Sequence, residues 1–281
     1  MSGLRLAAAA LAALLVAAPA AAQRAAQDYE PQVGQAGKDV SWVPTPDAVV
    51  ERMLRMAQVT ASDMVVDLGA GDGKIAIAAA KHFGARALGI EYNPDMVAFA
   101  RGAIERAGVA GRARVVQGDI FAADFSQATV VTMYLLPALN LRLRPILLSM
   151  RPGTRVVSHS FGMDDWEPDE LSLLDGRRIY FWIVPASVAG AWTLELAGEG
   201  APARVELTLD QRYQKIEGTV GLGPVLAGLR EARLAGTRIA FAYVDARGVR
   251  LEFEGRVDGP RMDGTFRAGD GAEGRWTAAK K

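Results

Sequence analysis

The chain has 281 residues, half of them hydrophobic, with 32 basic residues, 32 acidic residues and no cysteine. This composition suits one large or two ordinary globular domains, and it excludes a disulfide framework and thiol chemistry. The balanced charge gives no basic excess of the kind that draws a protein to nucleic acid, so the sequence does not favour a nucleic acid partner.

Residues 1–22 have the pattern of a secretory signal peptide. Arg5 precedes an apolar run from Leu6 to Ala18, and proline and small residues follow up to Ala22. The run is shorter than the roughly 20 residues that a membrane-spanning helix needs. We therefore expect cleavage after Ala22 and a periplasmic or secreted protein with no stable membrane span. An uncleaved N-terminal anchor is the alternative.

The next segment changes from polar and irregular to helical. Residues 23–40 contain glycine and proline and lack periodicity, which predicts a flexible leader. A helix is expected after it, because Thr45 is a good N-cap, Pro46 suits the first helical position and Asp47 favours the helix dipole. The apolar face of this helix comprises Val49, Val50, Met53, Leu54 and Ala57.

The stretch VVDLGAGDGK, from Val65 to Lys74, predicts a buried strand that leads through a glycine turn into a helix. Met64–Leu68 is short and apolar, and Ile75–Phe83 is alanine-rich. Glycine at such a turn reaches positive φ and lets a ligand approach the free N–H groups at the start of the helix. The stretch therefore predicts a site for a nucleotide-like ligand.

The spacing of the glycines separates three families that use such a turn. A dinucleotide-binding turn requires glycine in place of Lys74, and a phosphate-binding loop requires glycine in place of Leu68 and a hydroxyl in place of Ile75. Neither pattern fits. The pattern acidic-x-G-x-G-x-G is formed by Asp67, Gly69, Gly71 and Gly73. It resembles the first motif of Rossmann-like S-adenosylmethionine-dependent methyltransferases, and a purely structural glycine turn is the alternative.

Strands alternate with helices up to Pro185, which predicts an α/β fold with a doubly wound, mostly parallel sheet. The expected strands are Met64–Leu68, Ala87–Glu91, Arg114–Gln117, Val130–Tyr134, Arg155–Ser160 and Ile179–Val184. The expected helices are Lys74–Phe83, Pro94–Ala107 and Leu139–Met150. Ligands of such sheets lie beyond the carboxyl ends of the strands. We assign this domain to residues 41–185.

Helical periodicity disappears in residues 186–281, where short alternating runs predict a small antiparallel barrel or sandwich of about eight strands. The runs are Trp192–Leu196, Arg204–Leu209, Ile216–Val220, Ala232–Leu234, Arg238–Val244, Val249–Arg256, Met262–Phe266 and Gly274–Ala278. The similar sequences at 190–192 and 274–276 would bring the first and last strands together if the barrel closes. This part has no histidine, which excludes a three-histidine metal site there.

Polar residues also follow the second and third expected strands. Glu91 ends the second strand about twenty residues past the glycine turn, where a carboxylate accepts both hydroxyls of a ribose. Asp119 and Ile120 follow the third strand, where they would meet the edge and the face of an adenine. A solvent-facing acid at Glu91 and a turn residue at Asp119 are the alternatives.

The segments VPTPDAVVERML, DLGAGDGK, GIEYNP, GDIF and VVTMYLLP occur in an order and spacing that resemble one small methyltransferase family. This family includes the mitochondrial protein-lysine methyltransferases of the ATP synthase c subunit and the adenine nucleotide translocase. The resemblance covers about Trp42 to Trp166. It implies a protein-lysine N-methyltransferase with S-adenosyl-L-methionine as cofactor and a protein or small molecule as methyl acceptor.

The resemblance also implies roles for individual residues. The expected cofactor-binding residues are Thr45, Asp67, Gly69, Gly71, Gly73, Glu91, Asp119 and Ile120. Tyr134 stands on the catalytic face, and the expected substrate rim comprises Trp42, Leu135, Pro137 and Trp166. His159 is a candidate base for the lysine proton, with a structural role as the alternative. No catalytic dyad is required, because positioning and desolvation supply most of the catalysis of methyl transfer from a sulfonium. No metal is expected.

Two features depart from this family. Only Ile179–Val184 is clear where the family fold ends in an antiparallel strand pair, and export would separate the protein from a methyl donor made in the cytoplasm. An exported, non-catalytic binding module with the same fold and a small-molecule methyltransferase are therefore alternatives. We expect the β-domain to fold separately, to supply no cofactor ligand, and to overhang the rim near Tyr134 and His159 as a selector or lid. A stabilising or oligomerising role is the alternative.

Overall fold

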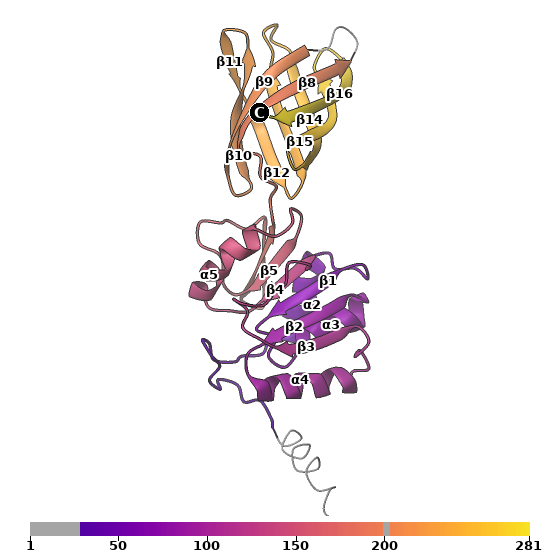
Figure 1. Ribbon diagram of the computed structural model, residues 1–281, viewed down its shortest axis with the longest axis vertical. Coiled ribbons are helices and arrows are strands. Elements are labelled where there is room, and N and C mark those ends of the chain that lie inside the picture. Colours follow the sequence, from indigo (N-terminus) through magenta and orange to yellow (C-terminus); the bar gives the residue numbers. More distant parts are fainter. Residues whose placement is uncertain (1–28, 199–202) are drawn as a thin grey trace, which may run out of the picture.

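The computed structural model describes residues 29–198 and 203–281 (Figure 1). The expected signal peptide and the first part of the expected leader lie outside the described residues. The described chain forms a seven-stranded sheet flanked by helices and a nine-stranded antiparallel sheet, and the two are stacked along the long axis of the molecule. Across the described ranges, no helix has the length and apolar character needed to cross a bilayer.

The seven-stranded sheet has the strand order β3-β2-β1-β4-β5-β7-β6. Its elements are α2 (Asp47–Met56), β1 (Met64–Leu68), α3 (Lys74–Phe83), β2 (Arg86–Glu91), α4 (Pro94–Arg106), β3 (Ala113–Gln117), β4 (Val130–Met133), α5 (Pro137–Leu148), β5 (Arg155–His159), β6 (Glu170–Leu174) and β7 (Arg177–Ile183). Strands β1 to β5 pair in parallel. The order reverses between β1 and β4, and a ligand crevice is expected at such a switch point.

Both faces of this sheet are buried, which explains the nearly continuous apolar runs of its central strands. Successive side chains of a strand point to opposite faces. Val65 accordingly packs with residues of α2, α3 and α4, while Val66 packs on the other face with residues of α5. The sequence correctly predicted the doubly wound Rossmann-like architecture.

Strand β6 was not predicted, and it completes the antiparallel pair with β7. Its alternation runs opposite to the usual pattern, because Leu171 and Leu173 are exposed while Ser172 between them is buried. Because the polar residue faces inward and the leucines face outward, hydrophobic periodicity does not predict this edge strand.

The expected cap of the first helix is wrong. Helix α2 begins at Asp47 with Pro46 at the N-cap position, and no side chain caps it. The hydroxyl of Thr45 lies instead 3.2 Å from Nδ1 of His159. A buried partner 114 residues away therefore replaced the local hydrogen bond that sequence rules favour.

The described part of the expected leader is folded rather than flexible. The backbone N–H of Gly34 donates to the Trp42 carbonyl at 2.8 Å, and the N–H of Trp42 donates to the Gln35 carbonyl at 2.9 Å. A bridge between Ala36 and Ser41 closes the turn. Residues 34–42, called the N-terminal turn below, are polar because they line a cavity and not because they lack structure.

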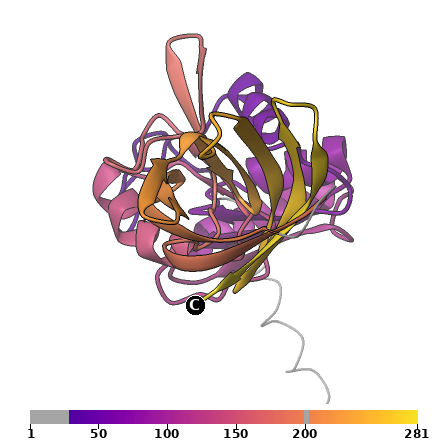
Figure 2. The ribbon, with the colours of Figure 1, turned by 90° about the horizontal axis from the view of Figure 1, so that it is seen from above.

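The nine-stranded sheet has the order β11-β10-β9-β8-β16-β15-β14-β13-β12. Its strands are β8 (Gly190–Gly198), β9 (Ala203–Arg212), β10 (Lys215–Leu222), β11 (Val225–Gly228), β12 (Arg230–Ala235), β13 (Arg238–Val244), β14 (Arg250–Asp258), β15 (Arg261–Ala268) and β16 (Glu273–Lys280). Strand β8 pairs with β16, as the two similar tryptophan sequences predicted. Figure 2 shows the sheet curled into a nearly closed barrel. Strand β11 was missed because Val225 and Leu226 both face solvent.

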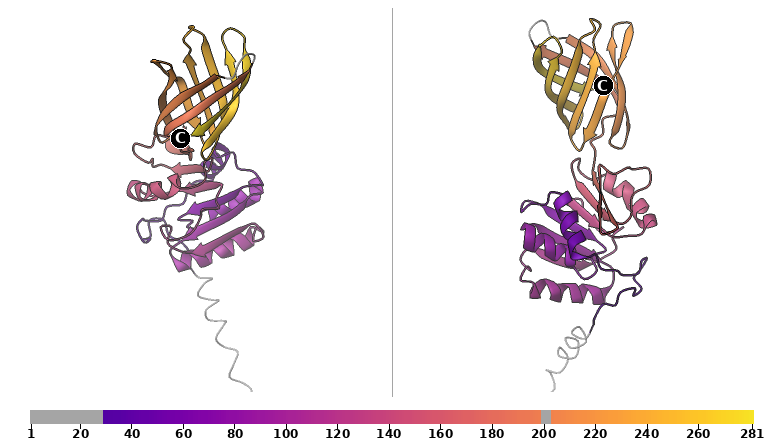
Figure 3. Two further views of the ribbon diagram at one scale, coloured as in Figure 1. Left: turned by 45° about the horizontal axis from the view of Figure 1, so that its top comes forward. Right: turned by 180° about the vertical axis from the view of Figure 1, so that it is seen from behind.

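The β-domain lies at the edge of the seven-stranded sheet where the parallel strands begin (Figure 3). The N–H of Ala186 donates to the Gly236 carbonyl, and a Cβ on Gly236 would lie 3.0 Å from Cα of Gly153, just before β5. The expected overhang at the substrate rim is therefore wrong. Strand β7 is antiparallel to β5, so the chain returns to the amino ends of the parallel strands before it enters the barrel.

Candidate functional site

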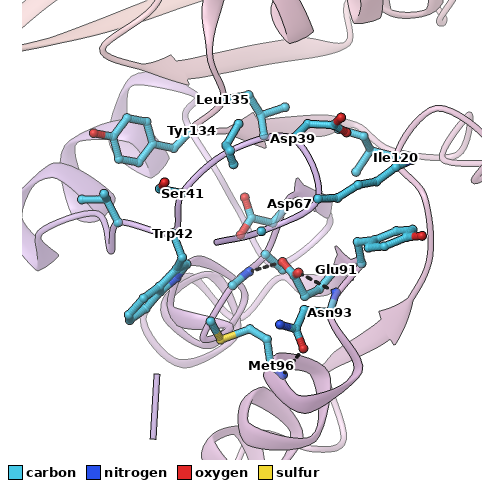
Figure 4. Close-up of a pocket in the computed structure, with 18 of the residues that line it drawn as sticks. Asp39, Ser41, Trp42, Asp67, Glu91, Asn93, Met96, Ile120, Tyr134 and Leu135 are labelled. Carbon is cyan, nitrogen blue, oxygen red and sulfur yellow. Dashed lines mark hydrogen bonds between the residues drawn. The ribbon is translucent and has the colours of Figure 1, made fainter. Parts of the chain in front are cut away.

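A cavity of about 400 Å³ lies at the carboxyl ends of β1, β2 and β4 (Figure 4). Its walls come from the N-terminal turn, the glycine turn and the segments that follow β2, β3 and β4. Among the described residues, none after Phe161 lines it. This volume falls in the range of small-molecule and cofactor sites.

The glycine turn can be built only with glycine. Gly69 and Gly71 have φ of 79° and 53°, a region that other residues rarely adopt. A Cβ on Gly71 would also lie 2.5 Å from Nε1 of Trp42. Gly73 does not line the cavity; its own Cβ would lie 3.2 Å from Ala100, so this glycine serves the packing of α3 on α4.

Glu91 is held by the backbone on both of its carboxylate oxygens. Oε2 accepts from the N–H of Gly71 and Oε1 accepts from the N–H of Asn93, each at 2.9 Å (Figure 4). Asn93 in turn caps α4 by accepting from the N–H groups of Asp95 and Met96. Each carboxylate oxygen retains a second lone pair, so the group can still accept hydrogen bonds from two neighbouring hydroxyls of a ligand.

Asp67 is a buried carboxyl at the end of β1. Only 3% of its surface is exposed, and its Oδ1 accepts from the Thr132 hydroxyl at 2.8 Å. Burial raises the pKa of Asp67 to about 7, with further upward contributions from the nearby charges of Asp72 and Glu91, while the Thr132 hydrogen bond lowers it. A cationic group of a ligand beside Asp67 would restore its charge.

A cation and a carboxylate meet at the far end of the cavity. Lys38 Nζ donates to Asp119 Oδ2 at 2.7 Å and lies 4.7 Å from the centroid of the Tyr92 ring. The hydrogen bond from Lys38 lowers the pKa of Asp119. Ile120 lines the cavity beside this pair, as expected. Sequence reasoning missed Lys38, since it belongs to the segment expected to be flexible and gives no local signal.

Three aromatic side chains gather at the opposite end of the cavity. The ring of Tyr134 lies 4.0 Å from that of His159 and 6.3 Å from that of Phe161, measured between centroids. Tyr134, Phe161 and Thr45 line the cavity, whereas His159 lies behind them and is 1% exposed. Burial lowers the pKa of His159 to about 4, with a smaller contribution from the charge of Arg177.

The position of His159 does not support its expected role as the base that meets an acceptor amine directly. A base must come within hydrogen-bond reach of the proton that it accepts. The Nε2 atom of His159 is buried without a hydrogen-bond partner in the described structure, and Nδ1 faces Thr45. The histidine is therefore a neutral group one layer behind the cavity wall.

The expected rim residues divide into two groups. Trp42 and Leu135 line the cavity, but Pro137 only begins α5. Trp166 is wholly buried at the domain junction, where its Nε1 donates to Oε1 of Gln214 at 3.1 Å. Its assignment to the rim is wrong, because the segment between β5 and β6 returns to the amino ends of the parallel strands, where the Trp166 carbonyl accepts from Nε1 of Trp182 at 2.9 Å. The described ranges contain no cluster of three or more His, Asp or Glu side chains suited to a metal ion.

The lining of the cavity is acidic. Its ionisable residues are Lys38, Asp39, Asp67, Asp72, Lys74, Glu91 and Asp119, besides two tyrosines. Both lysines are already paired, Lys38 with Asp119 and Lys74 with Asp47 at 2.9 Å. The cavity is therefore suited to a ligand with a cationic group and neighbouring hydroxyls.

Comparisons with known proteins assign this site to a family. A profile described as the ANTKMT methyltransferase domain matches residues 67–170. A protein-lysine N-methyltransferase of Saccharolobus islandicus is 46% identical over 151 residues, which are 52% of this chain and 94% of that protein. The human lysine N-methyltransferase of the ATP synthase c subunit is 33% identical over 132 residues, which span 47% of this chain but 56% of that protein.

A solved structure covers the same portion. It is described as an RNA methyltransferase from Salinibacter ruber in complex with S-adenosyl-L-homocysteine, and it is 52% identical with a TM-score of 0.51. The match covers 52% of this chain and 96% of that chain. The similarity thus extends over nearly all of two relatives and about half of this chain.

Proposed function

Because this chain belongs to the S-adenosylmethionine-dependent methyltransferase family that includes the protein-lysine N-methyltransferase of Saccharolobus islandicus, we propose that it methylates the side-chain amine of a protein lysine. The observation that carries the proposal is the acidic cavity that ends in an apolar slot at Tyr134 and Leu135. S-adenosylmethionine is the cofactor, and when bound it supplies an electrophilic methyl group on a sulfonium.

The residues of the cavity fit this cofactor. Glu91, fixed by two backbone N–H groups, accepts the ribose hydroxyls. Asp67 accepts from the amino group of the methionine part, whose positive charge restores the carboxylate. Ile120 and Tyr92 contact the adenine. The ion pair of Lys38 with Asp119 forms the wall of the cavity at its adenine end. Gly69 and Gly71 line the cavity and have no Cβ, so their backbone could lie along the cofactor.

The acceptor end favours an amine. Lysine reaches the site as an ammonium, which the carboxylates of the lining attract. Leu135, Leu136 and the Tyr134 ring then desolvate it, and desolvation lowers the pKa of an ammonium. With the cofactor bound, the amine proton would pass to solvent water, and the nitrogen lone pair would form the bond to the methyl carbon as the carbon–sulfur bond breaks and leaves its electron pair on sulfur. Positioning and desolvation supply the catalysis.

RNA is the second candidate acceptor, since the Salinibacter ruber structure carries that description. The lining of the cavity contains no arginine, and its two lysines are both paired with carboxylates. Phosphates would meet repulsion there, whereas RNA-binding sites generally present unpaired cations and aromatic stacking surfaces. The charge of the site therefore favours a lysine-bearing protein over RNA.

Transfer of a labelled methyl group tests the proposal. The protein is incubated with labelled S-adenosylmethionine and, in parallel, with envelope proteins, the same proteins after chemical blocking of their lysines, total RNA and small-molecule extract. We expect label in protein lysines and its loss after blocking. Label in RNA or in small molecules alone would overturn the lysine assignment. Cofactor binding by calorimetry without transfer to any fraction would support the non-catalytic binding module instead.

We also propose that the chain is exported and acts outside the cytoplasm, on the basis of its apolar N-terminal run and the small residues up to Ala22. Export would restrict the acceptors to proteins of the cell envelope and would require S-adenosylmethionine in that compartment. Cell fractionation with N-terminal sequencing of the mature protein tests this. A protein recovered intact in the cytoplasm would contradict it.

A further inference from the structure

One buried hydrogen bond joins the cavity wall to the layer behind it. Oγ1 of Thr45 and Nδ1 of His159 lie 3.2 Å apart, although the two residues are 114 positions apart in the chain. Thr45 lines the cavity and is 7% exposed, while His159 is 1% exposed. The only other polar atom of the imidazole, Nε2, has no partner among the described residues. The imidazole is thus aimed at the Thr45 hydroxyl alone.

The order of the strands tells which ligand this pair faces. The residues at the carboxyl ends, in spatial order from β3 through β2, β1 and β4 to β5, are Asp119, Glu91, Asp67, Tyr134 and His159. Neighbouring strands lie about 4.8 Å apart, so His159 is roughly 14 Å from the strand that ends in Glu91. A cofactor whose ribose is at Glu91 and whose amino group is at Asp67 leaves the β4–β5 end to the methyl acceptor. Thr45 therefore borders the acceptor amine.

The direction of the hydrogen bond decides what Thr45 can offer to that amine. A hydroxyl has one proton and two lone pairs. If His159 donates from Nδ1, the Thr45 proton points elsewhere and can serve an anionic ligand. If His159 accepts at Nδ1, the Thr45 proton is used in the hydrogen bond to Nδ1, and the Thr45 oxygen presents its lone pairs to the cavity. The acidic lining and the slot at Tyr134 favour a ligand with N–H donors, which matches the second arrangement.

We propose that His159 is a positioning residue. Its Nδ1 accepts a hydrogen bond from the Thr45 hydroxyl, and this turns the lone pairs of the Thr45 oxygen toward an N–H of the acceptor amine. This inference rests on the proposed lysine methylation. One N–H of the neutral amine is then held by Thr45, so the nitrogen lone pair points at the methyl group. The His159 ring also supports Tyr134, whose ring centroid lies 4.0 Å away.

The His159 imidazole must stay neutral to accept the hydrogen bond from Thr45. A protonated ring would donate from Nδ1, so the Thr45 hydroxyl would have to accept instead of donate. It would also place a third positive charge near the sulfonium and the amino group of the cofactor. Burial favours the neutral ring, and so does the charge of Arg177, the one charged side chain of the described residues that contributes to its titration. Thr45 before α2 and Tyr134 after β4 contact the ring, and neither carries a charge.

A double-mutant cycle tests the coupling. Thr45→Val removes the hydroxyl with little change of shape, and His159→Phe keeps a ring against Tyr134 but removes the nitrogen. We expect each to lower kcat/KM for the protein acceptor about tenfold, the scale of one hydrogen bond, and the double variant to be no worse than either. Thr45→Ser and His159→Asn, which keep an oxygen near the original atom, should recover most of the lost rate.

Cofactor affinity and the tautomer give readouts that do not depend on activity. Calorimetry should show S-adenosylmethionine binding within about twofold of wild type for all four variants, a change too small for a lost ligand contact. The chain has only two histidines, His82 and His159, so nitrogen-15 spectra of histidine-labelled protein can be assigned with a His82→Gln variant. We expect His159 to carry its proton on Nε2.

Each outcome separates this inference from the function on which it rests. A wild-type protein that methylates no lysine would remove both. With an active wild type, additive effects in the cycle or a proton on Nδ1 of His159 would overturn the inference alone. A cofactor affinity reduced tenfold or more by Thr45→Val would show that Thr45 serves the cofactor, and this too would overturn the inference.

Discussion

Strand β1 has a buried aspartate near each end, and the two have opposite electrostatic character. Asp63, at the amino end, accepts hydrogen bonds from the Thr129 hydroxyl and the N–H of Thr60, both at 2.7 Å, and pairs with Arg155. Burial alone would raise its pKa, but these partners together hold the pKa below its ordinary value. Asp67, at the carboxyl end, has a pKa raised to about 7.

The difference separates structural from ligand-binding charge. Asp63 is satisfied within the protein and ties β1 to β5 through Arg155. Asp67 has no cation of the described chain among the groups that set its pKa, so its pKa stays raised until a ligand supplies a positive charge. Buried groups whose charge is left uncompensated by the fold are typical of functional sites. The β-domain is attached at the amino edge, on the side of Asp63, and the cavity lies at the carboxyl edge, on the side of Asp67.

Asp63→Ala should give the largest effect on stability. The substitution leaves the partly buried guanidinium of Arg155 and the Thr129 hydroxyl without their partner, and breaking a buried ion pair from one side costs about 3–5 kcal/mol. Urea unfolding followed by circular dichroism measures it. Asp67→Ala is the matched variant at the other end of β1 and should cost less, since its carboxyl is already poorly satisfied. Equal losses would contradict the distinction.

The pH dependence of stability should show two opposing contributions. The folded pKa of His159, about 4, lies below its unfolded value of about 6.5, so its stabilisation is present above pH 6.5 and is lost as the pH falls toward 4. The folded pKa of Asp67, about 7, lies above its unfolded value, so its stabilisation is present below about pH 4 and is lost as the pH rises through 7.

The two slopes offset each other between pH 4 and 6.5 in the wild type. In Asp67→Asn only the contribution of His159 to the pH dependence of the unfolding free energy remains. This variant should therefore lose about 3 kcal/mol of stability relative to wild type as the pH falls from 6.5 to 4. His159→Phe should show the reverse slope. Urea titrations at several pH values measure both. Parallel profiles for the two variants would contradict the assignments.

Asp67→Asn should also weaken cofactor binding by about 1.5–3 kcal/mol, the scale of a hydrogen bond to a charged group. Calorimetry at pH 8 measures it, where the wild-type carboxyl is ionised. Asp72→Asn is a matched control in the same turn. Its side chain accepts from the N–H of Lys74 and lies farther from the end of β1, so a smaller loss is expected.

Cofactor affinity of the wild type should rise with pH up to about 7 and then level off. Binding of a cationic amino group requires Asp67 to release its proton. At pH values below the pKa of Asp67, each increase of one pH unit should therefore lower the dissociation constant by up to about tenfold, or 1.4 kcal/mol. Calorimetry in buffers of different ionisation enthalpy should detect the released proton at pH 6. Asp67→Asn should abolish this pH dependence, and its persistence in the variant would assign it to another group.

The smallest effect is expected at the domain junction. Asp165 accepts from Arg144 of α5, from Arg212 at the end of β9 and from Tyr213 in the turn that follows, and these side chains are partly or largely exposed. Exposed pairs are screened and contribute little. Asp165→Asn should leave the cofactor affinity within about twofold of wild type, as measured by calorimetry. A larger change would show that the amino edge communicates with the cavity, against the separation described above.

Local patterns in the sequence predicted the features that depend on neighbouring residues. The glycine turn, the strands before and after it and the strand-end position of Glu91 follow from periodicity and from the φ angles that only glycine reaches readily. The pairing of β8 with β16 was also predicted, because the first and last strands of the β-domain carry similar sequences. The fold class followed from these elements together, and the cofactor followed from the resemblance of the motifs to a methyltransferase family.

Local sequence patterns place the cofactor turn and the carboxylates at the strand ends, because chain-local geometry fixes those positions. Three other features required the packed fold: Lys38 reaches Asp119, Thr45 turns from its helix to His159, and Trp166 is buried at the junction. It also decided that β7 runs antiparallel and carries the β-domain away from the cavity. Contacts across tens of residues depend on how whole elements pack, and no short stretch of sequence contains that information.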